Sequence, residues 1–403
     1  MTRIGVCTAN HADRVRDAGS EPVEIGLPEV CPAGGVMLTR EWISDTVEVY
    51  LGSAELDALL IDAGRPEELV GLFLAALRLD LPSVVARRSD AYGGAFTALG
   101  VVPAREDVAE VIVELSAKGE PRLGELVGNF SLANALRVGL SMGGGPELAV
   151  HLSAIAREGD VSGFSRMLRV LVPETPVISP PHSGWFQEQG TEKLLSHLGE
   201  DLHDVPTVTG WIKNSLPSAP PIPEERSWLV FVEGQASGTK AICQVPPGTE
   251  EIAGECRVFY SEEEAVQAVR DEEIEPGDLI VVSGCGPRGG PGLLKLDALG
   301  RVLDGAKLAE STPVLTDGLP PDEAKGSWIS LVAPEAAKKG IVGRLRDGDF
   351  LRMDLQEERI RAGTKPAEIR SRDPYEIPND STAGYAARYA RSALPALAGA
   401  GFG

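Results

Sequence analysis

The first half of the chain alternates short apolar runs with longer segments in which apolar residues recur at helical spacing. The apolar runs cover residues 3–8, 57–62 and 82–86, and such compact runs are typical of strands buried in a parallel sheet. Between them, residues 39–51 and 67–79 carry apolar side chains every three or four positions, as a helix with one buried face does. This alternation predicts a layered α/β domain with a mostly parallel sheet.

The predicted α/β domain spans residues 1–215 and contains further helices. Residues 129–157 have helical spacing on both sides of a Gly-Gly-Gly-Pro sequence at 143–146, which predicts two helices separated by a break. A later apolar run at 173–180 predicts one more strand.

The pattern changes after a proline-rich segment, residues 216–226, which we interpret as a linker. Residues 227–370 are then dominated by short β-like runs with glycine turns, which predicts a β-barrel-like domain. One helix is expected at 261–269, a hairpin around Asp347-Gly348, and a tail with a helix in 371–403. The β-like runs are 228–232, 240–245, 256–260, 278–282, 313–316, 329–332, 341–346 and 350–354.

Composition narrows the possible classes of protein. The 403 residues are 43% hydrophobic, which is typical of a folded globular chain, and the formal net charge is −22. Nucleic acids and anionic membranes need a basic face, so neither is expected as a partner. No signal peptide and no run of about 18 apolar residues is evident, and we expect a cytoplasmic protein. The five cysteines form no Cys-x-x-Cys pair, which favours buried thiols over metal or disulfide chemistry.

Three motifs stand out in the second half of the chain: a Gly-Gly-Pro-Gly loop at 289–292, a Thr-Asp-Gly turn at 316–318 and a Pro-Glu-Ala-Ala sequence at 334–337. Together with four other segments, they resemble the dihydroxy-acid dehydratase and 6-phosphogluconate dehydratase family. The resemblance implies an α/β domain followed by a β-barrel-like domain, a homodimer, and a site between the two domains. The other matching segments are 59–84, 140–158, 206–210 and 386–390.

The residues that carry the family's chemistry are missing from these segments. The resemblance implies an iron–sulfur cluster, Mg²⁺ and a serine base. At the position of the family's cysteine, metal-binding aspartate and modified lysine, the chain has Arg65, Pro66 and Glu67. Cys285 stands where the family has a metal-ligand glutamate, and Pro321 stands where it has the serine. Arginine cannot ligate iron as a thiolate does and proline cannot act as a base, so we expect no iron–sulfur cluster, no metal and no other cofactor.

Three residues are candidates for catalysis. His182 lies in a segment that resembles the family's substrate-facing Pro-Ser-Gly loop and could act as acid or base. Cys285 could be a nucleophile or a small apolar filler in a crowded turn. Asp317 could hold its turn or contact a ligand. The candidates for substrate binding are Ser183, Gly184, Arg288, Gly289, Gly290, Gly292, Arg65 and Glu67.

Three functional hypotheses follow. The first is a repurposed enzyme of specialised metabolism that acts on a small polar carboxylate in the inter-domain cleft by elimination, cyclisation or isomerisation. The second is a catalytically inactive homologue that serves as a binding or partner subunit. The third is a true dehydratase with an unfamiliar metal site. It is the least favoured of the three, because the sequence keeps few residues that could serve as metal ligands. The retained Gly289–Gly292 loop and Ser183-Gly184 favour a pocket, and therefore the first hypothesis.

Overall fold

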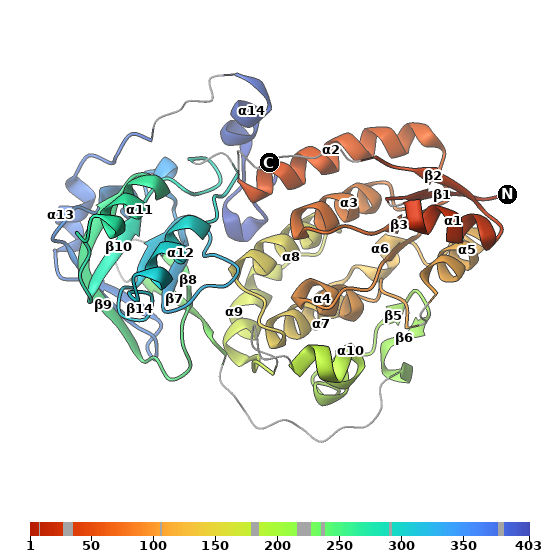
Figure 1. The fold of residues 1–403 in the computed structure, drawn as a ribbon, viewed down its shortest axis with the longest axis horizontal. Helices are drawn as coiled ribbons and strands as arrows, with labels where there is room; N and C mark the ends of the chain where they lie inside the picture. The colour runs from red at the N-terminus through yellow and green to blue at the C-terminus, as the bar shows by residue number, and fades with distance from the viewer. Residues whose placement is uncertain are drawn as a thin grey trace.

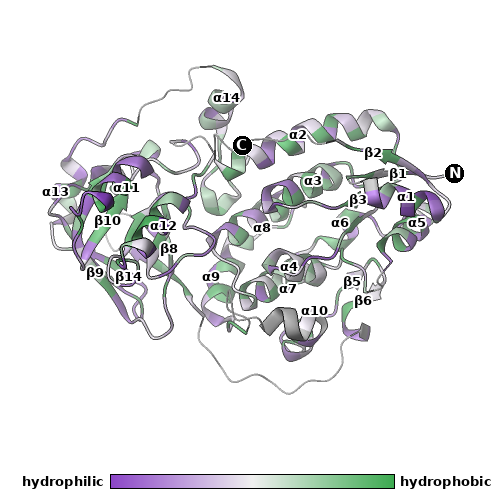
Figure 2. Ribbon diagram, viewed as in Figure 1, coloured by the Kyte–Doolittle hydropathy of each residue, from purple (hydrophilic) through white to green (hydrophobic). Residues whose placement is uncertain are grey.

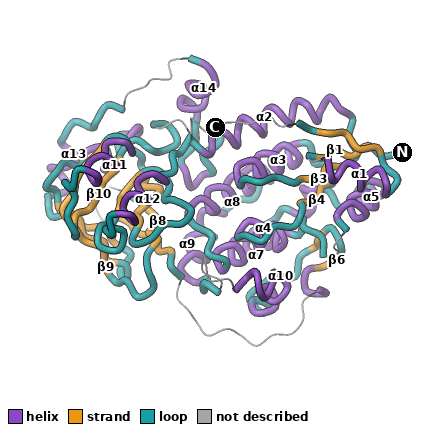
Figure 3. Tube along the Cα trace, viewed as in Figure 1, coloured by secondary structure: helices purple, strands orange, loops and turns teal. Residues whose placement is uncertain are grey.

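The chain folds into a helix-rich half and a strand-rich half (Figures 1 and 3). The computed structural model describes residues 1–7, 9–26, 35–104, 107–178, 185–215, 227–234, 238–289, 292–377 and 383–403. The predicted fold class is confirmed, because a parallel α/β sheet is followed by a closed eight-stranded barrel. The bounds predicted for the domains remain predictions, and the proposed linker lies outside the described residues.

The N-terminal sheet has the strand order β2-β1-β3-β4, and all three pairings are parallel. Strand β3 is fully buried, and its four residues are all apolar. The strand bounds are β1 Arg3–Val6, β2 Glu21–Glu24, β3 Ala58–Ile61 and β4 Ser83–Val85. The helices connecting these strands are α1 Ala9–Asp17, α2 Val36–Ala54 and α3 Pro66–Arg78. The three predicted apolar strands and the two predicted helices are therefore present.

A second set of helices packs on this unit. The predicted break at 143–146 is confirmed, and Pro146 is the first residue of the helix that follows it. The strand predicted at 173–180 is wrong, because Pro173 lies inside a helix and residues 175–178 form no strand. The helices are α4 Ala91–Leu99, α5 Val108–Lys118, α6 Leu123–Leu126, α7 Asn129–Ser141, α8 Pro146–Glu158, α9 Phe164–Glu174 and α10 Trp185–His197. A short hairpin, β5 Pro206–Thr207 and β6 Gly210–Trp211, and the 3-10 helix η1 Ile212–Ser215 follow.

The second half is a closed barrel with the strand order β10-β11-β12-β8-β7-β14-β13-β9. Strands β9, β10, β11 and β12 run parallel to one another, so their carboxyl ends meet at the same end of the barrel. The bounds are β7 Leu229–Gly234, β8 Lys240–Gln244, β9 Glu251–Phe259, β10 Asp278–Val282, β11 Val314–Thr316, β12 Trp328–Ala333, β13 Phe350–Asp354 and β14 Arg359–Ala362. Strand β10, in which residues 279–282 are all apolar and buried, is coloured as strongly hydrophobic in Figure 2.

One predicted strand of the barrel is absent. Residues 341–346 begin with the 3-10 helix η3, Ile341–Arg344, so no hairpin forms around Asp347-Gly348. Strand β13 pairs instead with β9 and β14. The helix expected at 261–269 is confirmed, and Ser261 caps it, because the Glu264 amide donates to Ser261 Oγ at 3.1 Å. The remaining elements of this half are the helices α11 Glu262–Arg270, α12 Asp297–Gly305 and α13 Pro366–Ser371 and the 3-10 helix η2 Ala336–Lys338.

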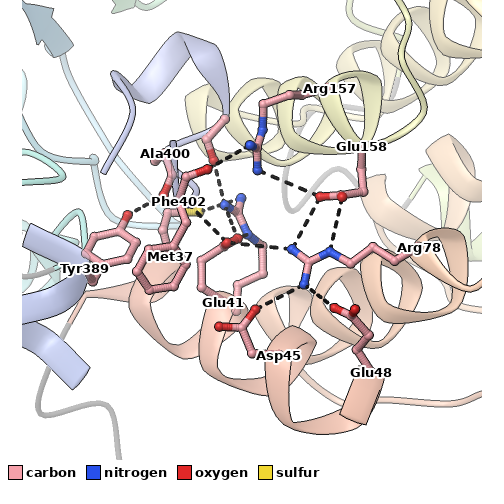
Figure 4. A network of polar contacts seen from close by, with 12 residues as sticks. Met37, Glu41, Asp45, Glu48, Arg78, Arg157, Glu158, Tyr389, Ala400 and Phe402 are labelled. Atoms are coloured by element: carbon pink, nitrogen blue, oxygen red, sulfur yellow. Dashed lines mark hydrogen bonds and ion pairs between the residues drawn. The ribbon is translucent and has the colours of Figure 1, made fainter. Parts of the chain in front are cut away.

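The C-terminal segment returns to the α/β half (Figure 4). Helix α14, Gly384–Ser392, and the 3-10 helix η4, Ala396–Ala398, contribute apolar residues to the N-terminal core. The fully buried Arg40 donates to Glu41 Oε1 at 2.8 Å and to the Gly399 carbonyl at 2.6 Å. Arg157 Nη1 donates to the Phe402 carbonyl at 2.8 Å. The end of the chain is therefore part of the structure of the first domain. No helix among the described residues has the length and apolar character needed to cross a membrane.

Candidate functional site

The parallel strands of the barrel bring three of the predicted segments to one end. Residues 283–289 follow β10, Asp317 follows β11, and the Pro-Glu-Ala-Ala sequence follows β12. Ligands of parallel-stranded proteins commonly bind at the carboxyl ends of the strands. This end of the barrel is the first candidate site.

Asp317 organises this end of the barrel. Its side chain is buried, and its Oδ1 accepts hydrogen bonds from the amides of Gly284 at 3.0 Å and Cys285 at 2.8 Å. Its Oδ2 accepts from the amide of Ala336 at 2.8 Å. Burial raises the pKa of Asp317, although the three amides favour the charged form. The geometry supports the loop-holding alternative, since both oxygens are engaged by backbone groups.

Cys285 lies in the apolar interior beside this turn. It is 2% exposed and packs in a cluster of buried apolar residues under α11 and α12. Burial raises the pKa of its thiol well above the ordinary value, and Asp317 raises it further. A nucleophilic thiol needs a lowered pKa and access, so this position favours the small-filler alternative.

Arg288 and Gly289 line a cavity of about 750 Å³, which we call the barrel-end cavity. Beside it, the Arg288 amide donates to Glu335 Oε2 at 2.9 Å, and Arg288 Nη1 donates to the Arg391 carbonyl at 2.9 Å. Burial raises the pKa of Glu335 to about 7 despite the Arg288 amide. The other lining residues are Ala336, Ala337, Lys339 and residues 373–377.

Gly292 lies against the beginning of helix α2. Its carbonyl accepts a hydrogen bond from the Met37 amide at 2.8 Å, at the beginning of α2. It has a φ of +100°, and a Cβ built there would lie 2.4 Å from Leu38 Cβ. Glycine at this position therefore permits contact between the two domains. Gly290, His182, Ser183 and Gly184 lie outside the described residues, and their proposed roles remain predictions.

Arg65 and Glu67 lie elsewhere, at the N-terminus of α3. Arg65 Nη1 is 3.3 Å from Glu67 Oε1, and Arg65 Nη2 is 2.8 Å from Glu68 Oε1. Burial raises the pKa of Glu67, and Glu147 and Lys295 are among its charged neighbours. The structure therefore does not place these two residues with Arg288 and Gly289, which line the barrel-end cavity.

The charged residues around Glu67 form a second candidate site. Lys295 Nζ lies 2.6 Å from Glu147 Oε2, in the first turn of α8, and 2.7 Å from Asp322 Oδ1. His151 is fully buried, and its Nε2 lies 3.4 Å from Glu147 Oε1. Its ring packs edge-on against the ring of Tyr92, with 5.7 Å between the ring centroids. We call this group the seam cluster, because α8 belongs to the first domain and Lys295 and Asp322 to the second. Its members are Glu67, Tyr92, Glu147, His151, Lys295 and Asp322.

Burial and charge set the pKa values in the seam cluster. Burial lowers the pKa of His151 to about 4 and outweighs the nearby Glu147. Burial opposes ionisation of Glu147, but Lys295 and His151 together lower its pKa to about 2. The charges of Glu147 and Asp322 raise the pKa of Lys295 despite its burial. Glu147 and Lys295 are therefore an ionised, buried pair.

Sequence reasoning missed the main residues of both sites. Lys295 and Glu147 are far apart in the chain, and only the domain contact brings them together. Glu335 was visible as part of the Pro-Glu-Ala-Ala sequence, but its raised pKa depends on burial at the barrel end. The break at 143–146 could have drawn attention to Glu147, because it predicts a helix that begins at Pro146. An acidic residue in the first turn of a helix is stabilised by the helix dipole.

The fold and the two sites define a class of two-domain protein with an α/β unit, a closed mixed barrel and a charged seam. Residues 224–400 match the family described as dihydroxy-acid/6-phosphogluconate dehydratase C-terminal. The chain is 27% identical to a dihydroxy-acid dehydratase of Geobacter metallireducens and 29% identical to one of Syntrophotalea carbinolica, over 96% of this chain and 88% of each relative. A dihydroxy-acid dehydratase of Moorella thermoacetica is 25% identical over 96% of this chain and 89% of the relative. The chain is therefore similar over nearly its whole length to dihydroxy-acid dehydratases, and its C-terminal part matches the dihydroxy-acid/6-phosphogluconate dehydratase family.

This chain is shorter than the region that it matches. The alignment with the Geobacter metallireducens relative extends over 489 residues, more than the 403 that the chain contains. The relative therefore has internal segments without a counterpart here.

The described residues do not fit the metal groups that the family resemblance implies. Cys243 and Cys256 lie in the barrel core, and Cys285 lies in a separate apolar cluster. Cys7, at the end of β1, has a thiol pKa that burial raises to about 11. Within the described ranges, no three His, Cys, Asp or Glu side chains are placed to hold a metal ion. We therefore derive no chemical step through a metal or a cluster.

Proposed function

We propose that this chain is a cluster-free enzyme of specialised metabolism that acts on a small polar carboxylate. The reaction would be an elimination, cyclisation or isomerisation, and the substrate would lie in the barrel-end cavity. The observation that carries the proposal is the buried Glu335, which accepts a hydrogen bond from the amide of the lining residue Arg288 behind the cavity wall, and whose pKa burial raises to about 7. Perturbed carboxyl groups next to a cavity are characteristic of acid–base sites.

The cavity suits a small anion. Its volume of about 750 Å³ lies within the range of small-molecule sites. Its wall carries the cations Arg288 and Lys339 as well as the carboxylates Asp373 and Glu376, and a guanidinium such as that of Arg288 can bind a substrate carboxylate through two parallel hydrogen bonds. A carboxyl group with a pKa near 7 can accept or release a proton at neutral pH, as each of the three reaction types requires. We assign substrate binding to Arg288 and proton transfer to Glu335.

The names of the relatives suggest which substrates to test. A panel of 2-hydroxy and 2,3-dihydroxy carboxylates would be incubated with the full chain in D₂O, and conversion or deuterium incorporation would be followed by NMR. We expect the wild type to act on at least one member, Glu335→Gln to lose turnover, and Arg288→Lys to raise KM. Lys325→Ala, an exposed charge paired with Asp304, is the matched control. Unchanged turnover in Glu335→Gln would overturn the assignment.

A catalytically inactive partner subunit is the second candidate function. This alternative is favoured because the candidate catalytic groups are already occupied or buried. Backbone amides bind the Asp317 carboxylate, Cys285 is inaccessible, and the charges of the seam cluster are paired with one another. Inactivity across the panel, together with stoichiometric co-purification of another enzyme, would support this alternative.

We also propose that the chain works as a homodimer in the cytoplasm, without nucleic-acid or membrane partners. The acidic net charge of −22 supports the last two exclusions. Light scattering on the purified full chain would measure the oligomeric state, and a monomer at micromolar concentration would contradict the dimer.

A further inference from the structure

Two buried carboxyl groups meet at the carboxyl end of the parallel barrel strands. Asp317 follows β11 and Glu335 follows β12. A Cβ built on Gly286 would lie 2.4 Å from Glu335 Oε2 and 3.3 Å from Asp317 Oδ2, so the two oxygens are close neighbours. Because glycine has no side chain, the loop after β10 can lie directly against both carboxyl groups.

Backbone amides favour a negative charge on one member of this pair. Asp317 accepts hydrogen bonds from three amides, two in the loop after β10 and one after β12. Glu335 accepts a hydrogen bond from the amide of Arg288 at 2.9 Å. Hydrogen bonds from amides stabilise the charged form of a carboxyl group, and Asp317 receives more of them. Asp317 is therefore the member that holds a charge better.

Charged and titratable groups of several elements face Glu335. Arg288 Nε lies 4.0 Å from Glu335 Oε1, and Lys338 of η2 also attracts the glutamate charge. The buried Tyr389 of α14 interacts electrostatically with Glu335. The negative charge of Asp317 acts in the opposite direction to the two cations, and together with burial it raises the pKa of Glu335. Two carboxyl groups this close do not both ionise readily, because their like charges repel each other.

We propose that Asp317 and Glu335 form a carboxyl pair with one proton, in which Asp317 carries the charge and Glu335 the proton. Asp317 is a positioning residue, since it ties the loops after β10 and β12 together and keeps its neighbour in the acid form. This inference rests on the proposed function for the role of the proton. Glu335 then starts the reaction as an acid: its O–H bond breaks, the proton passes to the substrate, and the carboxylate later takes a proton back from the substrate or from water.

The test is infrared spectroscopy of the full chain from pH 4 to 9, in which a protonated carboxyl group has a C=O band separate from that of a carboxylate. We expect the wild type to show such a band that disappears as the pH rises through about 7, and Glu335→Gln to lack it. Asp317→Asn should move the disappearance about one pH unit lower, because the neighbouring negative charge is removed. Glu376→Gln, which changes an exposed carboxylate of the cavity wall, is the matched control and should leave the band unchanged.

Two results would overturn the proposal. One is the absence of any protonated carboxyl band that depends on Glu335, and the other is an Asp317→Asn band that disappears at the wild-type pH. If Asp317→Asn does not fold, the wild type and Glu335→Gln are labelled with ¹³C-aspartate and titrated by NMR. One aspartate carboxyl signal should shift together with the Glu335 band in the wild type and not in Glu335→Gln, and no such signal would contradict the pair.

The infrared and NMR measurements need no substrate, so the carboxyl pair and the proposed activity can fail separately. A chain that has the expected band but converts no member of the substrate panel would support the pair and overturn the activity. A chain that converts a substrate without the Glu335 band would overturn the pair alone.

Discussion

Lys295 Nζ of the barrel domain lies 2.6 Å from Glu147 Oε2 in the first turn of α8, and both side chains are largely buried. The pair joins the domains where their apolar surfaces also meet, since Leu293 and Leu319 pack into the core of the α/β domain. The helix N-terminus favours the negative charge of Glu147, and Lys295 balances it directly.

Replacement of Lys295 by methionine should destabilise the protein strongly. Removal of one partner leaves a buried charge uncompensated, which costs about 3–5 kcal/mol of the free energy of unfolding. The double variant Lys295→Met/Glu147→Leu should recover much of this loss, because neither charge of the buried pair is then left without its partner. Urea unfolding at pH 7 measures both effects. Lys325→Ala breaks an exposed ion pair with Asp304 that has a similar N–O distance, and it should leave the urea midpoint unchanged. An equal loss of stability in Lys295→Met and Lys325→Ala would contradict a special role for the buried pair.

His151 should make the protein sensitive to mild acid. Its pKa is lowered to about 4 by burial, whereas an unfolded histidine titrates near 6.5, so the unfolded state binds more protons between these values. The contribution to stability is therefore complete above pH 6.5 and is lost as the pH falls toward 4, by on the order of 3 kcal/mol. His151→Gln should lose less stability than the wild type over this interval. Urea unfolding at pH 7, 6, 5 and 4.5 tests this, and parallel curves for the two proteins would argue against a neutral buried His151.

Glu335 should have the opposite pH dependence. Its folded-state pKa of about 7 lies above the unfolded value near 4.3, so the folded state binds more protons between these values. Stability should therefore fall as the pH rises from about 4.3 to 7, and stay level above, with a total change on the order of 3–4 kcal/mol. Glu335→Gln should remove this decline. Unfolding of both proteins from pH 5 to 8 measures the difference, which should grow with pH up to 7.

The buried thiols should resist alkylation. Cys243, Cys256 and Cys285 are each no more than 2% exposed, and burial raises the pKa of all three. Because the thiolate is the reactive form, iodoacetamide at pH 8 should leave them unmodified in the native protein and label them in guanidinium chloride. Peptide mass spectrometry identifies the labelled positions. Rapid native labelling of Cys285 would restore the hypothesis that it is a nucleophile.

Most of the fold could be predicted because buried elements carry their own pattern. Strands β3 and β10 are continuous apolar runs, and α3 has an apolar face with an acidic first turn. Strand β14 was missed because its alternation is weak: charged Arg359 and Arg361 are exposed, and Ile360 is only partly buried. Residues 341–346 have the composition of a strand, but tertiary contacts hold the first four in a 3-10 helix.

The candidate sites could be predicted only in part. Asp317 and Arg288 were found because they lie in recognisable glycine-rich turns. The distinction between holding a loop and contacting a ligand required the hydrogen bonds of Asp317 with distant amides. The pairing of Lys295 with Glu147 depends on how two domains meet, and no local pattern in the sequence specifies that.

The buried pair Arg40 and Glu41 should determine whether the C-terminal segment stays attached. Arg40 donates to Glu41 and to the Gly399 carbonyl, and the Phe402 amide lies 3.3 Å from Glu41 Oε2 (Figure 4). Arg40→Met should leave Glu41 buried without its nearest cation, at a cost of about 3–5 kcal/mol. It should also speed proteolytic cleavage near α14 relative to the wild type. The matched variant Arg40→Met/Glu41→Leu should regain stability but not protection of the tail, because it restores apolar packing without the hydrogen bonds to residues 399 and 402. Protection of the tail in both variants would show that apolar contacts of Tyr389 and Ala396 with the first domain are sufficient to hold it.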